Sequence, residues 1–113
     1  MLPSLKIFIT GGCGYVGTLL TQKLISDGHE VTVYDIQWFG NYLTPHESLK
    51  IIKGDIRKLD DISLKGYDTV IHLANIANDL GVDLNPILSW EVNVLAGQQL
   101  IDLAVRADVK HFV

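Results

Sequence analysis

The chain has 113 residues, of which 48% are hydrophobic and 19% charged, a composition that excludes a disordered chain and suits one small domain. Its formal net charge of −4, without a basic cluster, argues against a nucleic-acid partner, and no apolar run approaches the length of a membrane span. With Cys13 as the single cysteine and no N-terminal leader pattern, we expect no disulfide, no membrane association and a cytoplasmic location.

The first predicted elements are a strand, a glycine-rich turn and a helix. An apolar run predicts a strand from Leu5 to Thr10, directly before the turn. Beyond the turn, apolar residues recur at helical spacing, and the predicted buried face of this helix comprises Val16, Leu19, Leu20, Leu24 and Ile25. Gly28 is expected to cap the helix, and a second strand is predicted from Val31 to Asp35.

The middle of the chain predicts two further strands. Residues 37–48 contain glycine, asparagine and proline and are expected to form a loop. The third strand is predicted from Leu49 to Lys53, and a short helix is expected around Leu59 to Leu64. The fourth strand is predicted from Thr69 to Leu73.

A long helix and the start of a fifth strand are predicted in the C-terminal part. Asn85 as N-cap and Pro86 as the first helical residue predict a helix that ends at about Ala107. The predicted buried side of this helix comprises Ile87, Trp90, Val94, Ile101 and Val105. Gly97 costs about 1 kcal/mol of helix propensity relative to alanine, which close backbone packing would explain. Residues 109–113 predict a fifth strand, within which the sequence ends.

The alternation of strands and helices predicts an α/β protein. Right-handed crossovers between these elements give a Rossmann-type, doubly wound parallel sheet with the strand order 3-2-1-4-5, truncated in the fifth strand. In such a sheet, ligands bind beyond the carboxyl ends of the strands, where the chain reverses its direction of winding. The glycine-rich turn, Asp35 and Asp55 are therefore expected to meet at that edge.

The glycine-rich turn predicts a bound dinucleotide. Gly11, Gly14 and Gly17 form the pattern G-x-x-G-x-x-G, and Gly12 starts the overlapping pattern G-x-G-x-x-G. A pyrophosphate reaches backbone N–H groups only where no Cβ intervenes, and the first turn of a helix offers it unpaired donors and a positive dipole end. Asp35 lies 18 residues after Gly17, near the spacing of an acid that binds a ribose. The alternative for Asp35 is a solvated carboxylate at a strand end.

Taken together, the motifs resemble those of the extended short-chain dehydrogenase/reductases, in particular the NAD-dependent sugar-nucleotide epimerases and dehydratases. The resemblance covers almost the whole chain and rests on five motifs in the expected order, which are Thr10 to Gly17, Asp35, Gly54 to Arg57, His72 to Ala74, and Asn93 to Gly97. The doubled glycine followed by Tyr15 is similar to that of the UDP-glucose 4-epimerase-like members.

This resemblance implies an NAD site. The cofactor-binding residues that it implies are Gly11, Gly14, Tyr15, Val16, Gly17, Asp35, Ile36, Asp55, Ile56, Leu73, Ala74, Asn75 and Asn93. An anion at Asp35 would repel a 2′-phosphate, and no arginine occurs in residues 36–42, so NAD is favoured over NADP. Asp55 would accept a hydrogen bond from the adenine amino group, with Ile56 against the ring. The alternative for Asp55 is an Asx-turn.

No catalytic or metal-binding residue is predicted within these 113 residues. The family's mechanism needs a serine or threonine and a Tyr-x-x-x-Lys pair, and no tyrosine here is followed by a lysine four positions later. His72 lies in an apolar strand and is interpreted as structural, and the other histidines lack metal-ligand spacing. Asn75 departs from the alanine that is usual in the family. Asn93 either helps to order the active site or lies on a helix flank.

We therefore expect residues 1–113 to form an NAD-binding Rossmann domain without the catalytic and substrate regions. The expected parent protein is a nucleotide-sugar epimerase or dehydratase that works by transient hydride transfer to NAD, and this chain alone is expected to be inactive. Two alternatives stay open, a non-catalytic NAD-sensing or scaffold module and a methyltransferase that binds S-adenosylmethionine. The uncovered sheet edge and long helix predict a homodimer or another form of self-association.

Overall fold

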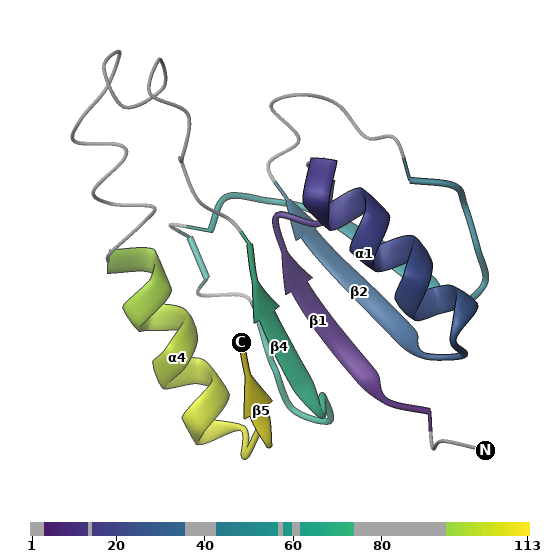
Figure 1. The fold of residues 1–113 in the computed structure, drawn as a ribbon. Helices are drawn as coiled ribbons and strands as arrows, with labels where there is room; N and C mark the ends of the chain where they lie inside the picture. Colours follow the sequence, from purple (N-terminus) through teal and green to yellow (C-terminus); the bar gives the residue numbers. More distant parts are fainter. Residues whose placement is uncertain (1–3, 14, 36–42, 57, 60–61, 74–94) are drawn as a thin grey trace, which may run out of the picture.

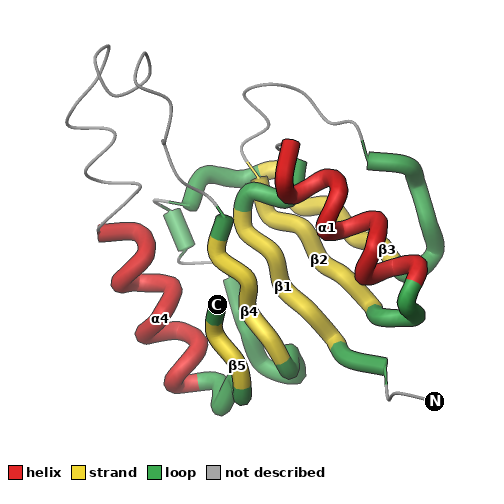
Figure 2. Tube along the Cα trace, in the orientation of Figure 1, coloured by secondary structure: helices red, strands yellow, loops and turns green. Residues whose placement is uncertain are grey.

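The computed structural model describes residues 4–13, 15–35, 43–56, 58–59, 62–73 and 95–113, and its strands form one parallel sheet (Figure 1). The strand order is β3-β2-β1-β4-β5, which confirms the predicted topology. The strands are β1 (Lys6–Thr10), β2 (Glu30–Asp35), β3 (Leu49–Lys53), β4 (Thr69–His72) and β5 (His111–Phe112). The described helices are α1 (Tyr15–Ser26) and α4 (Ala96–Arg106), which lie beside the sheet in Figure 2.

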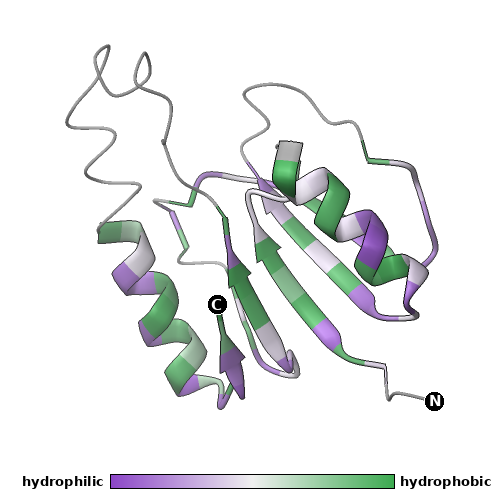
Figure 3. Cartoon of the chain, in the orientation of Figure 1, coloured by the Kyte–Doolittle hydropathy of each residue, from purple (hydrophilic) through white to green (hydrophobic). Residues whose placement is uncertain are grey.

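Side chains of β1 alternate between two core clusters, because successive residues of a strand point to opposite faces of the sheet. Ile7 and Ile9 belong to one cluster, against which Leu24 of α1 packs. Phe8 belongs to the other cluster, which includes Leu100 of α4. Apolar residues therefore recur along β1 and β2 and along both helices (Figure 3).

Helix α1 buries only part of the face that its apolar period predicted, since Leu24 and Ile25 pack against the core as expected. Val16 is 63% exposed and Leu19 is 56% exposed, whereas Thr21 is fully buried. Gly17 explains the difference, because a Cβ there would lie 2.5 Å from the Gly11 carbonyl oxygen. The first turns of α1 approach the backbone of the glycine-rich turn so closely that small residues, and not the large apolar ones, lie at the contact. The capping prediction for Gly28 is confirmed, with φ at 93° and its N–H bonded to a carbonyl of the last helical turn.

Helix α4 buries a different face from the one predicted. Ile101 is 40% exposed and Val105 is 70% exposed. The buried residues are instead Ala96, Gly97, Leu100 and Ala104. Residues spaced four apart form one row along a helix, and small side chains in that row let the helix axis come close to the sheet. The start of the predicted helix, with Ile87, Trp90 and Val94, lies outside the described residues.

The strand boundaries agree with the predictions to within a residue or two, and β3 agrees at both ends. The short helix expected around Leu59 to Leu64 is not found in the described part of that segment. Residues 62–64 are not helical, and the Ile62 N–H donates to the Leu59 carbonyl at 3.1 Å, which closes a turn. No helix among the described residues combines the length and the apolar character that a membrane crossing requires.

The corrected face of α4 makes a prediction about stability. We expect Leu100→Ala to lower the free energy of unfolding by about 2–5 kcal/mol, because Leu100 is completely buried. Gln99→Ala, at an exposed position of the same helix, is the control, and its effect should stay within about 0.5 kcal/mol. Equilibrium urea denaturation measures both values. Equal losses in the two variants would mean that α4 docks through another face.

Candidate dinucleotide-binding site

The candidate site lies at the carboxyl edge of the sheet, where the connections after neighbouring strands meet. The glycine-rich turn follows β1, Asp35 ends β2, Asp55 follows β3 and Leu73 follows β4. Because β1 lies between β2 and β4 and all pairings are parallel, the carboxyl ends of these strands lie side by side (Figure 1). This is the edge at which doubly wound sheets bind ligands.

Close packing accounts for the glycines of the turn. Gly11 has a φ of 75°, and its N–H donates to the Tyr34 carbonyl at 2.9 Å. A Cβ on Gly12 would lie 2.7 Å from both methyl groups of Val33. At Gly17 a Cβ would meet the backbone of the turn itself. The turn is thus a cradle of bare backbone in front of the N-terminus of α1, a place that suits an anionic pyrophosphate.

The Asp35 carboxylate lies against this turn. Its Oδ2 accepts a hydrogen bond of 2.9 Å from the Cys13 backbone N–H. The contact fixes the carboxylate beside the turn instead of in bulk water. This arrangement is the one that the ribose interpretation needs, and ribose binding itself stays a prediction.

Cys13 is a packing residue in this structure. Its side chain is buried in the core cluster that contains Val33. Burial and the nearby Asp35 carboxylate raise the pKa of the Cys13 thiol to about 11. The thiol is therefore protonated at neutral pH, as suits a small apolar side chain and not a nucleophile.

The turn after β3 is attached to the end of β2. The Gly54 N–H donates to the Asp35 carbonyl at 3.0 Å, and the Asp55 carbonyl accepts from the Lys58 N–H at 2.8 Å. Asp55 is half-buried beside this turn. Ile56 is buried in the core cluster, so little of its side chain is left to contact a ring. The adenine contacts of both residues stay predictions.

His72 has a structural partner. Its Nδ1 lies 2.6 Å from the Thr10 hydroxyl oxygen, across the β1–β4 pairing. Burial lowers the pKa of the His72 imidazole below its ordinary value, which favours the neutral ring. A Cβ on Gly97 would lie 3.4 Å from Nε2, so the backbone of α4 packs against this ring. The geometry supports the structural interpretation of His72.

The structure locates only part of the predicted residue set. Tyr15 is the first residue of α1, and the Leu73 N–H donates to the Thr10 carbonyl at 2.9 Å. The predicted residues that lie outside the described part of the chain are Gly14, Ile36, Ala74, Asn75 and Asn93. Within the described ranges, no group of three His, Cys, Asp or Glu residues could hold a metal ion.

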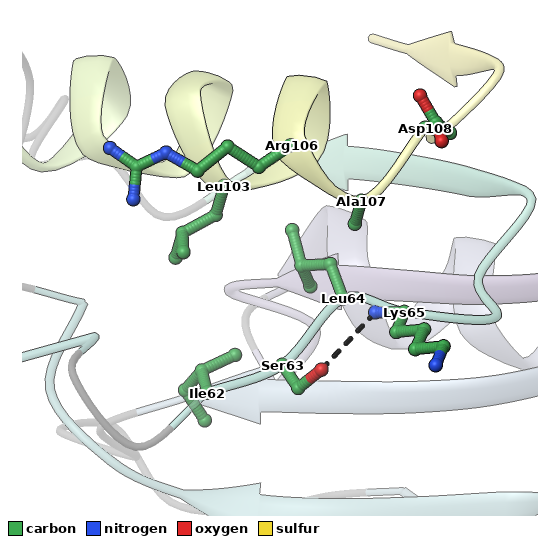
Figure 4. Close-up of a pocket in the computed structure, with 8 residues that line it drawn as sticks. All are labelled: Ile62, Ser63, Leu64, Lys65, Leu103, Arg106, Ala107 and Asp108. Atoms are coloured by element: carbon green, nitrogen blue, oxygen red, sulfur yellow. Dashed lines mark hydrogen bonds between the residues drawn. The ribbon is translucent and has the colours of Figure 1, made fainter.

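A cavity of about 410 Å³ lies away from this edge, between residues 62–65 and the C-terminal turn of α4 (Figure 4). Leu64 and Leu103 are among its apolar lining residues, and Lys65 and Arg106 among its charged ones. None of its lining residues belongs to the glycine-rich turn, to Asp35 or to the turn after β3. The cavity is therefore not part of the candidate site.

Comparison with known proteins identifies the class to which this site belongs. The sheet order and glycine cradle are those of a Rossmann-type domain, and the sequence model of the NAD dependent epimerase/dehydratase family matches residues 7–113. The chain belongs to this family, as the motifs predicted.

Individual relatives have different catalytic activities. UDP-glucuronic acid decarboxylase 1 of Danio rerio is 34% identical over 93% of this chain and 26% of the relative. The 3 beta-hydroxysteroid dehydrogenase/Delta 5→4-isomerase of Mycobacterium tuberculosis is 32% identical over 96% of this chain and 30% of the relative. The solved structure of MoeE5 in complex with UDP-glucuronic acid and NAD is 30% identical, with a TM-score of 0.81 over 95% of this chain and 35% of that one. The chain thus spans between 26% and 35% of the length of these proteins.

The glycine cradle makes a testable prediction. We expect Gly17→Ala to weaken NAD binding at least about tenfold, because the new methyl group would displace the turn from α1. Gly28→Ala is the control, since its Cβ meets nothing within 4 Å and its positive φ costs only about 1–2 kcal/mol of stability. Isothermal titration calorimetry on both variants measures the effect. Unchanged NAD affinity in Gly17→Ala would contradict the prediction that the glycine cradle binds the cofactor.

Proposed function

We propose that residues 1–113 form an NAD-binding domain of a nucleotide-sugar epimerase or dehydratase. The observation that carries the proposal is the Asp35 carboxylate, held by the Cys13 N–H against a glycine turn that has no room for a Cβ. An anion at this place suits the ribose hydroxyls of NAD and opposes the 2′-phosphate of NADP. When bound, NAD would accept and return a hydride.

The proposed contacts follow the order of the chain. Gly11 and the N-terminus of α1 would face the pyrophosphate, and Gly17 would let the helix pack closely behind the turn. Asp35 would face the adenosine ribose, and Asp55 the adenine amino group. The further residues proposed for the cofactor are Gly14, Tyr15, Val16, Ile36, Ile56, Leu73, Ala74, Asn75 and Asn93. These residues bind and orient the cofactor, and none of them is proposed to exchange a proton with substrate.

We further propose that a nucleotide sugar is the substrate of the complete protein. MoeE5 binds UDP-glucuronic acid, and the decarboxylase from Danio rerio is named for the same compound. The 113 residues contain no Tyr-x-x-x-Lys pair, so hydride transfer is not expected of this chain alone. A cytoplasmic location stays a prediction.

A second candidate is a module that senses NAD or serves as a scaffold without catalysis. The same cradle would serve it, and the absence of the tyrosine–lysine pair from these residues is compatible with it. The mass of the protein from its natural source separates the two functions. A mass near 12.5 kDa would favour the module, and a mass several times larger would favour the enzyme.

Cofactor selectivity tests the proposed function. We expect the chain to bind NAD in preference to NADP, and Asp35→Asn to weaken NAD binding about tenfold while it reduces that preference, because the charge is lost and the shape is kept. Asp27→Asn, which alters an exposed carboxylate in a surface ion pair, should change neither the affinity for NAD nor the preference for NAD over NADP. Titration calorimetry measures all three proteins. Binding of S-adenosylmethionine without NAD would overturn the proposal in favour of a methyltransferase.

We also propose that the chain associates with a second copy through the outer face of α4. Ile101 and Val105 lie one helical turn apart on this face, and both are exposed. Apolar side chains grouped on an exposed helix face are typical of an interface.

Sedimentation velocity tests this self-association. We expect the chain to sediment as a dimer, and Val105→Lys to sediment as a 12.5 kDa monomer, because a lysine would place a charge in the apolar contact. Gln99→Lys introduces the same charge elsewhere on α4 and should leave the dimer intact. A wild-type chain that is monomeric at every concentration would contradict the proposal.

A further inference from the structure

Tyr34 is a buried tyrosine with a polar tip, and it is not among the residues proposed to contact the cofactor. It precedes Asp35 on β2 and is only 5% exposed. Its ring stacks with that of Phe8 at a centroid distance of 6.1 Å, on the face of the sheet that α4 covers. A buried phenol needs a partner for its hydroxyl, and the choice of partner shows where the side chain acts.

The hydroxyl of Tyr34 reaches the turn after β3. It donates to the Asp55 carbonyl oxygen at 3.0 Å, and the Lys58 carbonyl oxygen lies 3.4 Å away. The same hydroxyl accounts for Gly54, because a Cβ there would lie 2.4 Å from the phenol oxygen. The Tyr34 side chain therefore fits only if residue 54 is a glycine. The next residue, Asp55, accepts the hydrogen bond from the same hydroxyl.

The backbone at the end of β2 connects the same turn to the glycine cradle. The Tyr34 carbonyl accepts from the Gly11 N–H at 2.9 Å, and the Asp35 carbonyl accepts from the Gly54 N–H at 3.0 Å. Two adjacent residues, Tyr34 and Asp35, thus contact both the glycine cradle and the turn after β3. The backbone bonds persist with any side chain at position 34, whereas the bond to Asp55 requires the phenol hydroxyl.

We propose that Tyr34 is a positioning residue for adenine recognition, whose hydroxyl fixes the turn at Gly54 and Asp55 in the conformation that binds the base. The inference rests on the proposed NAD site and adds a residue that does not touch the ligand. A turn that is already fixed loses less conformational freedom when the ligand binds, so the binding free energy is more favourable. Without the hydroxyl, the turn at Asp55 would lose one of the hydrogen bonds that hold it, and the ligand would have to supply more of its order.

The test compares NAD with nicotinamide hypoxanthine dinucleotide, in which a carbonyl replaces the adenine amino group. The wild-type chain should prefer NAD. Tyr34→Phe should weaken NAD binding about fivefold and binding of the hypoxanthine dinucleotide less than twofold, so that the preference shrinks. A purely structural role would weaken both ligands equally.

Tyr67→Phe is the matched control. Tyr67 contacts the same Phe8 ring edge-on at 5.3 Å, and its hydroxyl donates to the Thr32 hydroxyl at 2.9 Å, away from the turn after β3. This variant also loses one partly buried phenol hydroxyl. Its preference for NAD over the hypoxanthine dinucleotide should equal that of the wild type.

Hydrogen exchange provides a second measurement that needs no ligand. The Lys58 N–H, which bonds to the Asp55 carbonyl, should exchange faster in Tyr34→Phe and at the wild-type rate in Tyr67→Phe. Unchanged exchange at Lys58, or an equal loss of affinity for both dinucleotides, overturns the inference while the NAD site stands. A wild-type chain that binds neither dinucleotide overturns the proposed function and this inference with it.

Discussion

The contact on which the site depends is the approach of α1 to the turn before it. A Cβ on Gly17 would lie 2.5 Å from the Gly11 carbonyl oxygen and 2.6 Å from the Gly12 Cα, so the contact is one of backbone against backbone. It determines where α1 begins relative to the sheet and places bare peptide groups in front of that helix. It also explains why α1 buries Thr21 and leaves Val16 exposed, because a helix that lies this close to the sheet can only pack against it through small side chains.

From this contact the organisation extends across the sheet through the end of β2. The Asp35 carboxylate accepts a hydrogen bond from the Cys13 N–H of the glycine turn, and the Asp35 backbone carbonyl accepts one from the Gly54 N–H. Tyr34 adds the contact to Asp55 on the other side. The elements predicted to hold pyrophosphate, ribose and adenine are therefore not independent loops. A shift of the backbone at the end of β2 should affect all three together, whereas loss of the Tyr34 hydroxyl should affect the adenine contact alone.

Much of this fold was predictable from the sequence, because strand order follows from alternating elements and right-handed crossovers. The placement of the glycine turn, Asp35 and Asp55 at one edge followed from that order. The buried face of α4 was not predictable from apolar periodicity, which wrongly favoured Ile101 and Val105 over the small residues that pack on the sheet. Contacts such as Thr10 with His72 join side chains 62 positions apart, and no local pattern encodes them.

The family is NAD dependent, whereas the relatives of this chain carry different named activities. A decarboxylase named for a nucleotide sugar and a steroid dehydrogenase resemble this chain to a similar degree, 34% and 32%, over almost all of it. Their named activities differ, so the resemblance over this part of the chain does not by itself identify the reaction. The contacts that build the candidate dinucleotide site, by contrast, lie within these 113 residues: the approach of Gly17 to the turn, the bond from Cys13 to Asp35, and the bond from Tyr34 to Asp55.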